Sequence, residues 1–124
     1  MDLFEPSFTS IISRLSSKYR TVLNQNFTKN RFPDVSPDFW IVLEALYKED
    51  NLTIGQLAKL THKDNAGLSR IIDGMERNDL VNRIPNSTDK RSFLVVLTNY
   101  AKSLKEKLTK IEEETLTKST KGLN

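Results

Sequence analysis

Residues 65–97 read NAGLSRIIDGMERNDLVNRIPNSTDKRSFLVVL, and most of the expected fold can be inferred from them. Its first part repeats apolar residues every three or four positions, at Leu68, Ile71, Ile72 and Met75. The opposite side of the same expected helix has Ser69 at its edge and carries Ala66, Arg70, Asp73 and Arg77. This spacing predicts an amphipathic helix that buries one face and presents the other.

The second part of the stretch predicts a hairpin. Residues 80–84 and 92–97 are rich in β-branched and aromatic side chains, and the loop between them is rich in turn formers. Its tip is the charged sequence Thr88-Asp89-Lys90-Arg91. A polar helix face followed directly by a charged hairpin suits two neighbouring DNA grooves, so we expect double-stranded DNA as the partner.

A shorter helix is expected just before the amphipathic one. Thr53 and Gln56 have the capping-box spacing, and the residues after Thr53 that we expect to turn inward are Ile54, Leu57, Ala58 and Leu60. This helix breaks near residues 61–63, and Asp64 caps the next one. Two helices joined by a tight turn and followed by a hairpin predict a winged helix-turn-helix.

Two further helices flank this pair. Ser36 caps one that has Pro37 in its first turn and whose inward residues are Phe39, Val42, Leu43 and Leu46. Thr98 caps a single last helix that frays near residues 121–122 and whose inward residues are Ala101, Leu104, Leu108 and Ile111. In both helices the apolar residues recur every three or four positions, which predicts one buried face for each helix.

The N-terminal helix has one long apolar stripe, made of Phe8, Ile11, Ile12, Leu15, Tyr19, Val22, Leu23 and Phe27. Either it is a core helix or it partly buries itself against a second subunit. The expected fold is mainly α with a small β-hairpin wing. A winged helix-turn-helix over residues 36–98 is flanked by dimerisation helices over residues 7–30 and 99–120, within one domain of 1–124.

Composition narrows the function classes. The formal net charge is +3, and residues 59–91 hold seven basic and five acidic side chains. This small positive excess allows a polyanionic partner but does not by itself indicate one. The chain has no cysteine, which excludes disulfides and thiolate metal sites. It has neither a run of about 18 apolar residues nor a secretory signal, so we expect a cytoplasmic protein with no membrane partner.

From Phe39 to Leu104 the chain resembles the MarR family of winged-helix transcription regulators. The matching stretches are FWIVLEAL, LTIGQLAKLTHKDNAGLSRIIDGMERNDLV and STDKRSFLVVLTNYAKSL. The most specific motif is the wing signature Asp-x-Arg, here Asp89-Lys90-Arg91. The resemblance implies that Arg91 enters a minor groove while Asp89 holds its guanidinium, and a narrow groove does favour arginine.

The candidate DNA contacts follow from this pattern. Asn65, Ala66 and Ser69 lie at the helix end that usually meets base edges, and Arg70 and Arg77 lie on the polar face. The best candidates for phosphate neutralisation are Lys63, Arg83 and Lys90. The alternative reading makes Arg70 and Arg77 plain surface charges paired with Asp73. Gly67 and Asp79 depart from the family, which usually has a hydroxyl residue and a glycine there.

Catalytic and metal sites are not expected. His62 is the sole histidine and reads as a solvated turn residue, and no catalytic constellation or phosphate-cradling loop is present, so we predict no enzyme, cofactor or metal site. The resemblance implies a crevice for a small aromatic or phenolic effector. Its candidate lining residues are Tyr19, Phe32, Trp40 and Tyr47, with a plain core role as the alternative.

The leading hypothesis is a homodimeric repressor that binds a pseudo-palindromic operator and is released by a small molecule. The alternative is a winged helix that serves as a protein-interaction or assembly module without sequence-specific DNA binding.

Overall fold

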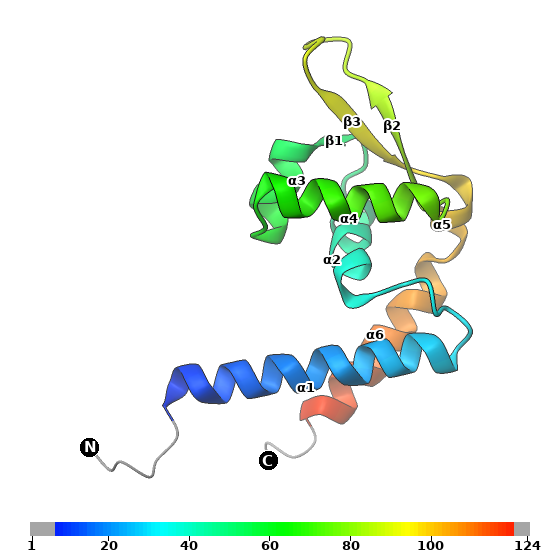
Figure 1. Ribbon diagram of the computed structural model, residues 1–124. Helices are drawn as coiled ribbons and strands as arrows, with labels where there is room; N and C mark the ends of the chain where they lie inside the picture. Colours follow the sequence, from blue (N-terminus) through cyan, green and yellow to red (C-terminus); the bar gives the residue numbers. More distant parts are fainter. Residues whose placement is uncertain (1–6, 121–124) are drawn as a thin grey trace. The chain divides into compact units, whose positions relative to one another are not determined.

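The computed structural model describes residues 7–120 of the chain, with side chains to residue 118 (Figure 1). Its helices are α1 (Phe8–Lys29), α2 (Pro37–Lys48), α3 (Ile54–Thr61), α4 (Asn65–Arg77), α5 (Asn99–Ser103) and α6 (Lys105–Thr120). Its strands are β1 (Leu52–Thr53), β2 (Val81–Pro85) and β3 (Phe93–Leu97). Within the described range no helix is long and apolar enough to cross a membrane. The fold is mainly α with a small antiparallel sheet, as the sequence predicts.

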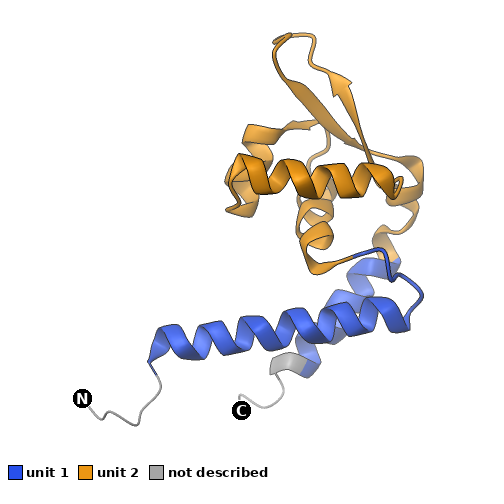
Figure 2. Ribbon diagram, viewed as in Figure 1, with its two compact units in different colours: residues 1–35, 107–124 blue, residues 36–106 orange. Residues whose placement is uncertain are grey.

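The chain divides into two compact units, which are treated separately (Figure 2). One unit spans residues 36–106 and contains α2, the helix pair α3 and α4, the sheet and α5. The other joins residues 1–35 to residues 107–124 and contains α1 with most of α6. The expected frayed end near residues 121–122 lies outside the described residues.

Side-chain caps begin the helices of the 36–106 unit where the sequence places them. Ser36, Thr53, Asp64 and Thr98 each accept a hydrogen bond from the backbone N–H three residues further on. In α3 the Gln56 side chain also accepts from the Thr53 N–H, which completes the capping box. These caps satisfy backbone donors that a helix start otherwise leaves unpaired.

Apolar faces of α2, α3, α4 and the sheet form the core of this unit. Its fully buried members include Val42, Leu43, Leu46, Leu57, Leu68, Ile72, Met75 and Val81. The expected inward position of Leu60 is wrong, because this side chain is 57% exposed. At about 100° per residue, Leu60 lies on the other side of the buried Leu57 from the half-buried Ile54 and Ala58, and so it faces away from the core.

The sheet has three strands in the order β1-β3-β2, all antiparallel. Val81 pairs with Leu97 at the root of the wing and Pro85 with Phe93 near its tip. Strand β1 is unexpected from the sequence: Leu52 pairs with Val95 immediately before the Thr53 cap. The two-residue β1 therefore ties the start of α3 to the wing strand.

The predicted single helix after Thr98 is instead interrupted at Leu104, between α5 and α6. Ala101 O accepts from the Leu104 N–H at 3.1 Å and from the Tyr47 hydroxyl at 2.6 Å. Since the carbonyl is taken by a three-residue turn and by a phenol from α2, regular helical bonding is broken at this point.

In the other unit, α1 and α6 carry the buried side chains Leu23, Phe27, Leu108 and Ile111. Asn26 Nδ2 donates to Thr115 Oγ1 at 2.7 Å, and this hydroxyl donates to Ile111 O. The first turns of α1 are different, because Phe8 is 79% and Ile12 49% exposed. The apolar stripe expected along α1 is thus buried in its second half and exposed at its start.

Candidate DNA interface

Helix α4 presents four kinds of surface around its axis. Leu68, Ile72 and Met75 are buried against the core. At about 100° per residue, three further stripes follow from the sequence. Ser69, Asp73 and Glu76 form the flank beside the wing; Gly67, Ile71 and Gly74 form the flank beside α2; the outward face carries Ala66, Arg70 and Arg77.

The outward face of α4 is exposed and basic. Ala66, Arg70 and Arg77 are all exposed, and within residues 7–118 neither arginine takes part in an ion pair. Asp73, offered above as their partner, pairs elsewhere. The face expected to meet DNA therefore carries two unneutralised guanidinium groups.

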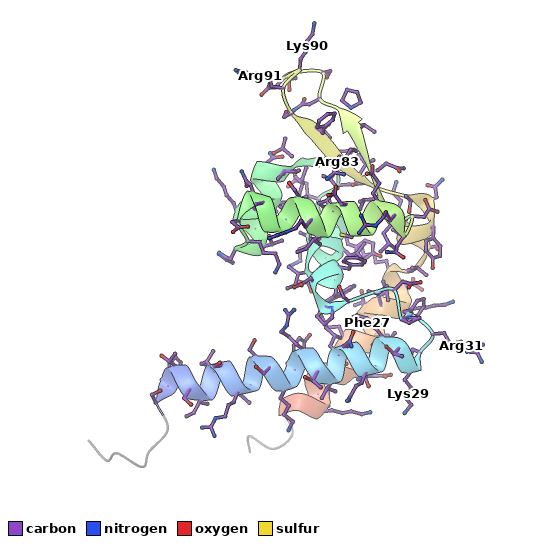
Figure 3. All side chains as sticks on the ribbon, in the orientation of Figure 1. Phe27, Lys29, Arg31, Arg83, Lys90 and Arg91 are labelled. Carbon is purple, nitrogen blue, oxygen red and sulfur yellow. The ribbon has the colours of Figure 1, made fainter. Side chains whose placement is uncertain are left out.

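The wing tip is a loop held by its own polar side chains. Asn86 accepts from the Thr88 N–H and donates to Ser92 Oγ, while Asp89 Oδ1 accepts from the Arg91 N–H at 3.0 Å. The same carboxylate lies 3.7 Å from Arg91 Nε. The Arg91 side chain is 94% exposed. Its backbone is therefore fixed while its guanidinium extends from the tip with Lys90 beside it (Figure 3).

Arg83 lies at the wing root and is already engaged (Figure 3). Its guanidinium reaches Asp73 Oδ1 at 2.7 Å and Glu76 Oε1 at 2.9 Å, and its backbone N–H donates to Glu76 Oε2. The Arg83 side chain is only 21% exposed. Arg83, which the sequence suggests as a phosphate contact, is thus paired with two carboxylates of α4.

Lys63 is also engaged, since its Nζ lies 3.2 Å from Asp38 Oδ1 and so links the helix-turn-helix turn to α2. Lys90 differs, because it is exposed and has no ion pair within the part of the chain described. Of the candidate phosphate contacts Lys63, Arg83 and Lys90, Lys90 is therefore the one whose charge is not paired within the described residues.

A recess of about 440 Å³ lies between the wing and the first turns of α3 and α4. Asn65, Asp89, Arg91 and Phe93 are among its lining residues. Asn65, the first residue of α4, and Arg91 of the wing thus line the same recess, although they are 26 positions apart in the sequence.

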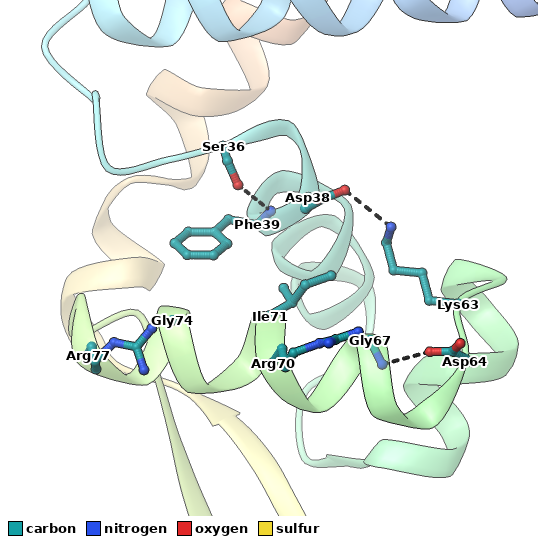
Figure 4. Close-up of a pocket in the computed structure, with 10 residues that line it drawn as sticks. All are labelled: Ser36, Asp38, Phe39, Lys63, Asp64, Gly67, Arg70, Ile71, Gly74 and Arg77. Carbon is teal, nitrogen blue, oxygen red and sulfur yellow. Dashed lines mark hydrogen bonds and ion pairs between the residues drawn. The ribbon is translucent and has the colours of Figure 1, made fainter.

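The other flank of α4 faces a wide-open surface recess of about 630 Å³ beside the start of α2 (Figure 4). A Cβ placed on Gly74 would lie 2.9 Å from Phe39 Cζ, so α4 approaches this ring closely only because residue 74 is glycine. A Cβ on Gly67 would lie 2.8 Å from the capping oxygen of Asp64. The departure from the family at Gly67 therefore coincides with a tight helix cap.

Asp79, the other departure, adopts the left-handed conformation with φ 59°. The Leu80 N–H donates to Met75 O and the Asp79 N–H to Glu76 O, which is the usual bonding of a glycine-type helix end. Asp tolerates this conformation better than most residues, so α4 still ends where the wing must begin.

The four candidate effector residues fall into both units: Tyr19 and Phe32 in one, Trp40 and Tyr47 in the other. Trp40 is buried, and its ring lies 6.2 Å from that of Tyr47. Burial raises the pKa of the Tyr47 phenol to about 12, so it stays protonated as the donor to Ala101 O. Within residues 7–118 no three potential metal-ligating side chains gather.

A helix-turn-helix pair, a hairpin wing and an exposed basic reading face define the winged-helix class of DNA-binding domains. Residues 35–93 match the model of the MarR family. This match and the winged-helix fold identify residues 35–93 as a MarR-family domain.

Known relatives agree with this assignment. The chain is 27% identical over 110 residues to YsmB, an uncharacterised HTH-type transcriptional regulator of Bacillus subtilis, covering 88% of this chain and 70% of YsmB. Three solved structures illustrate the shared fold. Wild-type MarR from E. coli in its apo form has a TM-score of 0.80 at 24% identity, covering 95% of this chain and 86% of MarR.

Bordetella bronchiseptica BpsR, studied for regulation of its DNA binding by 6-hydroxynicotinic acid, has a TM-score of 0.86 at 20% identity, covering 100% of this chain and 86% of BpsR. A mutant MarR from E. coli in complex with operator DNA has a TM-score of 0.85 at 24% identity, covering 100% of this chain and 89% of the mutant MarR chain. At these identities the likeness concerns the fold.

Proposed function

We propose that this protein is a homodimeric transcriptional repressor that binds a pseudo-palindromic operator. The α4 helix of each subunit enters the major groove, and Arg91 enters the flanking minor groove. One observation carries this proposal: Arg70, Arg77 and Arg91 are exposed with at most a long contact to a carboxylate, while the acidic side chains of α4 are paired with Arg83. Half-sites about one helical turn apart would match this geometry.

Base readout is assigned to the first turns of α4. Asn65 can pair with adenine, the Ala66 methyl can touch thymine, and Ser69 can hydrogen-bond either class of base. Phosphate contacts by Lys90 and, on the polar face, by Arg77 then position the helix without specifying sequence. Lys63 and Arg83 would have to leave Asp38, Asp73 and Glu76 to do the same.

The experiment that tests this function is a selection from a randomised duplex library, followed by fluorescence-anisotropy titrations on the selected duplex and on a mixed-sequence duplex at two salt concentrations. We expect clear enrichment of a two-part site. Ser69→Ala or Asn65→Ala should change the preference among sites. A uniform loss on every duplex would contradict base readout, and equal binding of all duplexes by the unmodified protein would favour the assembly-module alternative.

Dimerisation is supported by the exposed apolar start of α1. Phe8, Ile11 and Ile12 lie on one stripe of this helix and are exposed, which is costly in water unless another surface covers them. Ile12→Glu should shift the protein toward monomer in sedimentation equilibrium. Lys29→Glu, on the exposed last turn of the same helix, is the matched control. A monomeric unmodified protein would contradict the two-half-site mechanism.

A small aromatic or phenolic anion is the proposed effector. The likeness to BpsR, whose DNA binding 6-hydroxynicotinic acid regulates, supports this choice of ligand class. An effector acts only through different affinities for the DNA-bound and free states. Titrating 6-hydroxynicotinic acid into the protein–duplex complex should release DNA, and unchanged anisotropy would remove this compound as effector.

A further inference from the structure

We propose that Arg83 is a positioning residue that couples the wing to the reading helix, so that α4 and Arg91 engage DNA as one rigid unit. This inference rests on the proposed DNA-binding function and deepens it. Arg83 need not touch DNA to have this effect.

The contacts of Arg83 span two turns of α4. Its guanidinium bonds Asp73 and Glu76, and its NH2 group also approaches Ser69 O at 3.4 Å. At about 1.5 Å per residue, Ser69 and Glu76 are about 10 Å apart along the helix. A side chain that bonds both ends of such a stretch resists tilting of the wing in either direction along α4.

The position of Arg83 in β2 explains why it reaches the helix. Side chains alternate between the two faces of a strand, and Arg83 lies two residues after Val81, which is fully buried. Its cross-strand partner Val95 is buried as well. Arg83 therefore occupies the core-facing side of the wing, where an outward phosphate contact is not the natural direction.

The residue type fits this task. The planar guanidinium presents several N–H donors in a fixed fork and can bond two carboxylates together, whereas a lysine ammonium is a point charge on a flexible stem. Here NH1 takes Glu76 and NH2 takes Asp73. Lysine at position 83 would keep the charge and lose the fork.

Charge compensation is the second effect of the same contacts. Asp73 and Glu76 are the acidic residues of the α4 sequence, and both lie on the flank beside the wing. Left unpaired, they would repel the phosphate backbone that α4 must approach. Arg83 neutralises them from within the protein, and so it should contribute little to counterion release when DNA binds.

Hydrogen bonds of the β2–β3 ladder carry the position of the root to the tip. The pairs run from Val81 with Leu97 to Pro85 with Phe93, directly below the loop that carries Arg91. When Arg83 fixes the root on α4, the tip is positioned before DNA arrives. Preorganisation of this kind lowers the entropy lost on binding.

The test is a double-mutant cycle between Arg83 and Arg91, measured as dissociation constants for the selected duplex. Arg91→Ala is made in the unmodified protein, in Arg83→Lys and in Arg83→Gln. We expect the loss caused by Arg91→Ala to be smaller by at least about twofold in both Arg83 variants, since residues that act through one element are non-additive. Strict additivity in both backgrounds overturns the proposal.

Lys90→Gln is the matched control, because it removes one positive charge from the same hairpin without breaking an ion pair. It should flatten the salt dependence by up to about one phosphate equivalent, while Arg83→Gln should change the slope by less. If Arg83→Lys equals the unmodified protein and Arg83→Gln equals Lys90→Gln, Arg83 is a phosphate contact and the proposal is wrong.

A DNA-free measurement separates this proposal from the proposed function. NMR order parameters of the wing amides of residues 86–92 should fall in Arg83→Lys and in Asp73→Asn/Glu76→Gln, which retains Arg83, with α4 unchanged. Unchanged wing order parameters in both variants overturn the coupling. Failure of the unmodified protein to select any duplex instead overturns the DNA-binding function, whatever the wing amides show.

Discussion

The two arginines of the wing have opposite environments, although they are only eight positions apart in the sequence. Arg83 at the root bonds two carboxylates of α4 and is 21% exposed, whereas Arg91 at the tip is 94% exposed with one carboxylate 3.7 Å away. The charge of an arginine alone therefore does not assign its role. An engaged arginine sets position, and an exposed one with a fixed backbone is available to a polyanion.

The largest effect is expected at the tip. Arg91→Ala should weaken binding to every duplex by about tenfold or more and flatten the salt slope by about one phosphate equivalent. A salt titration by anisotropy measures both. Lys29→Ala, an exposed lysine on α1, is the control and should change neither. Unchanged affinity and slope for Arg91→Ala would remove the tip from the mechanism.

The next prediction concerns the close packing of α4 against Phe39 of α2. Gly74→Ala forces a methyl group against Phe39 and should lower the free energy of unfolding by about 1–2 kcal/mol, because overpacking outweighs the gain in helix propensity. Gly55→Ala is the matched control, since its Cβ would meet its nearest atom at 3.9 Å. Urea unfolding compares them, and an equally stable Gly74→Ala would show that α4 can shift without cost.

Tyr47→Phe removes the hydrogen bond by which the phenol of α2 holds Ala101 O of α5. We expect a loss of about 1 kcal/mol in unfolding free energy. The folded-state pKa of about 12 exceeds the ordinary 10, so the contribution is complete below pH 10 and disappears as pH rises toward 12. Unfolding of both proteins from pH 8 to 11.5 measures this, and a constant difference over that range would contradict it.

The smallest effect is expected from Asp89→Asn. The amide oxygen can still accept from the Arg91 N–H, while the charge near Arg91 Nε is lost, so affinity should fall only about two- to threefold. Asp89→Ala also removes the turn and should cost more in the same titration. Equal losses for the two variants would show that the carboxylate charge, and not the turn, orients the tip.

Local signals explain what could be predicted from the sequence. Caps such as Ser36, Thr53 and Asp64 depend on neighbours three residues away, so spacing alone locates the helix starts. The wing loop is similar, because Asn86 and Asp89 bond within their own turn. The exposed outward face of α4 follows equally from helical periodicity.

Contacts between distant residues could not be predicted in this way. The pairing of Leu52 with Val95 involves only two residues of β1 and gives no alternating pattern to recognise. The break at Leu104 depends on a phenol from α2. For Arg83 a signal was present, because its alternation with Val81 places it on the core side of β2, but its carboxylate partners depend on how the hairpin folds back on α4.

The hydroxyl of Thr115 has a consequence for how α1 and α6 can vary. It is fully buried, accepts from Asn26 and donates to Ile111 O. Sliding α6 by a single turn would separate Asn26 from Thr115 and break this bond, whereas the Thr115 hydroxyl would keep its bond to Ile111 O in the same helix. An insertion between Ile111 and Thr115 would change the alignment of α6 with α1 at this bond.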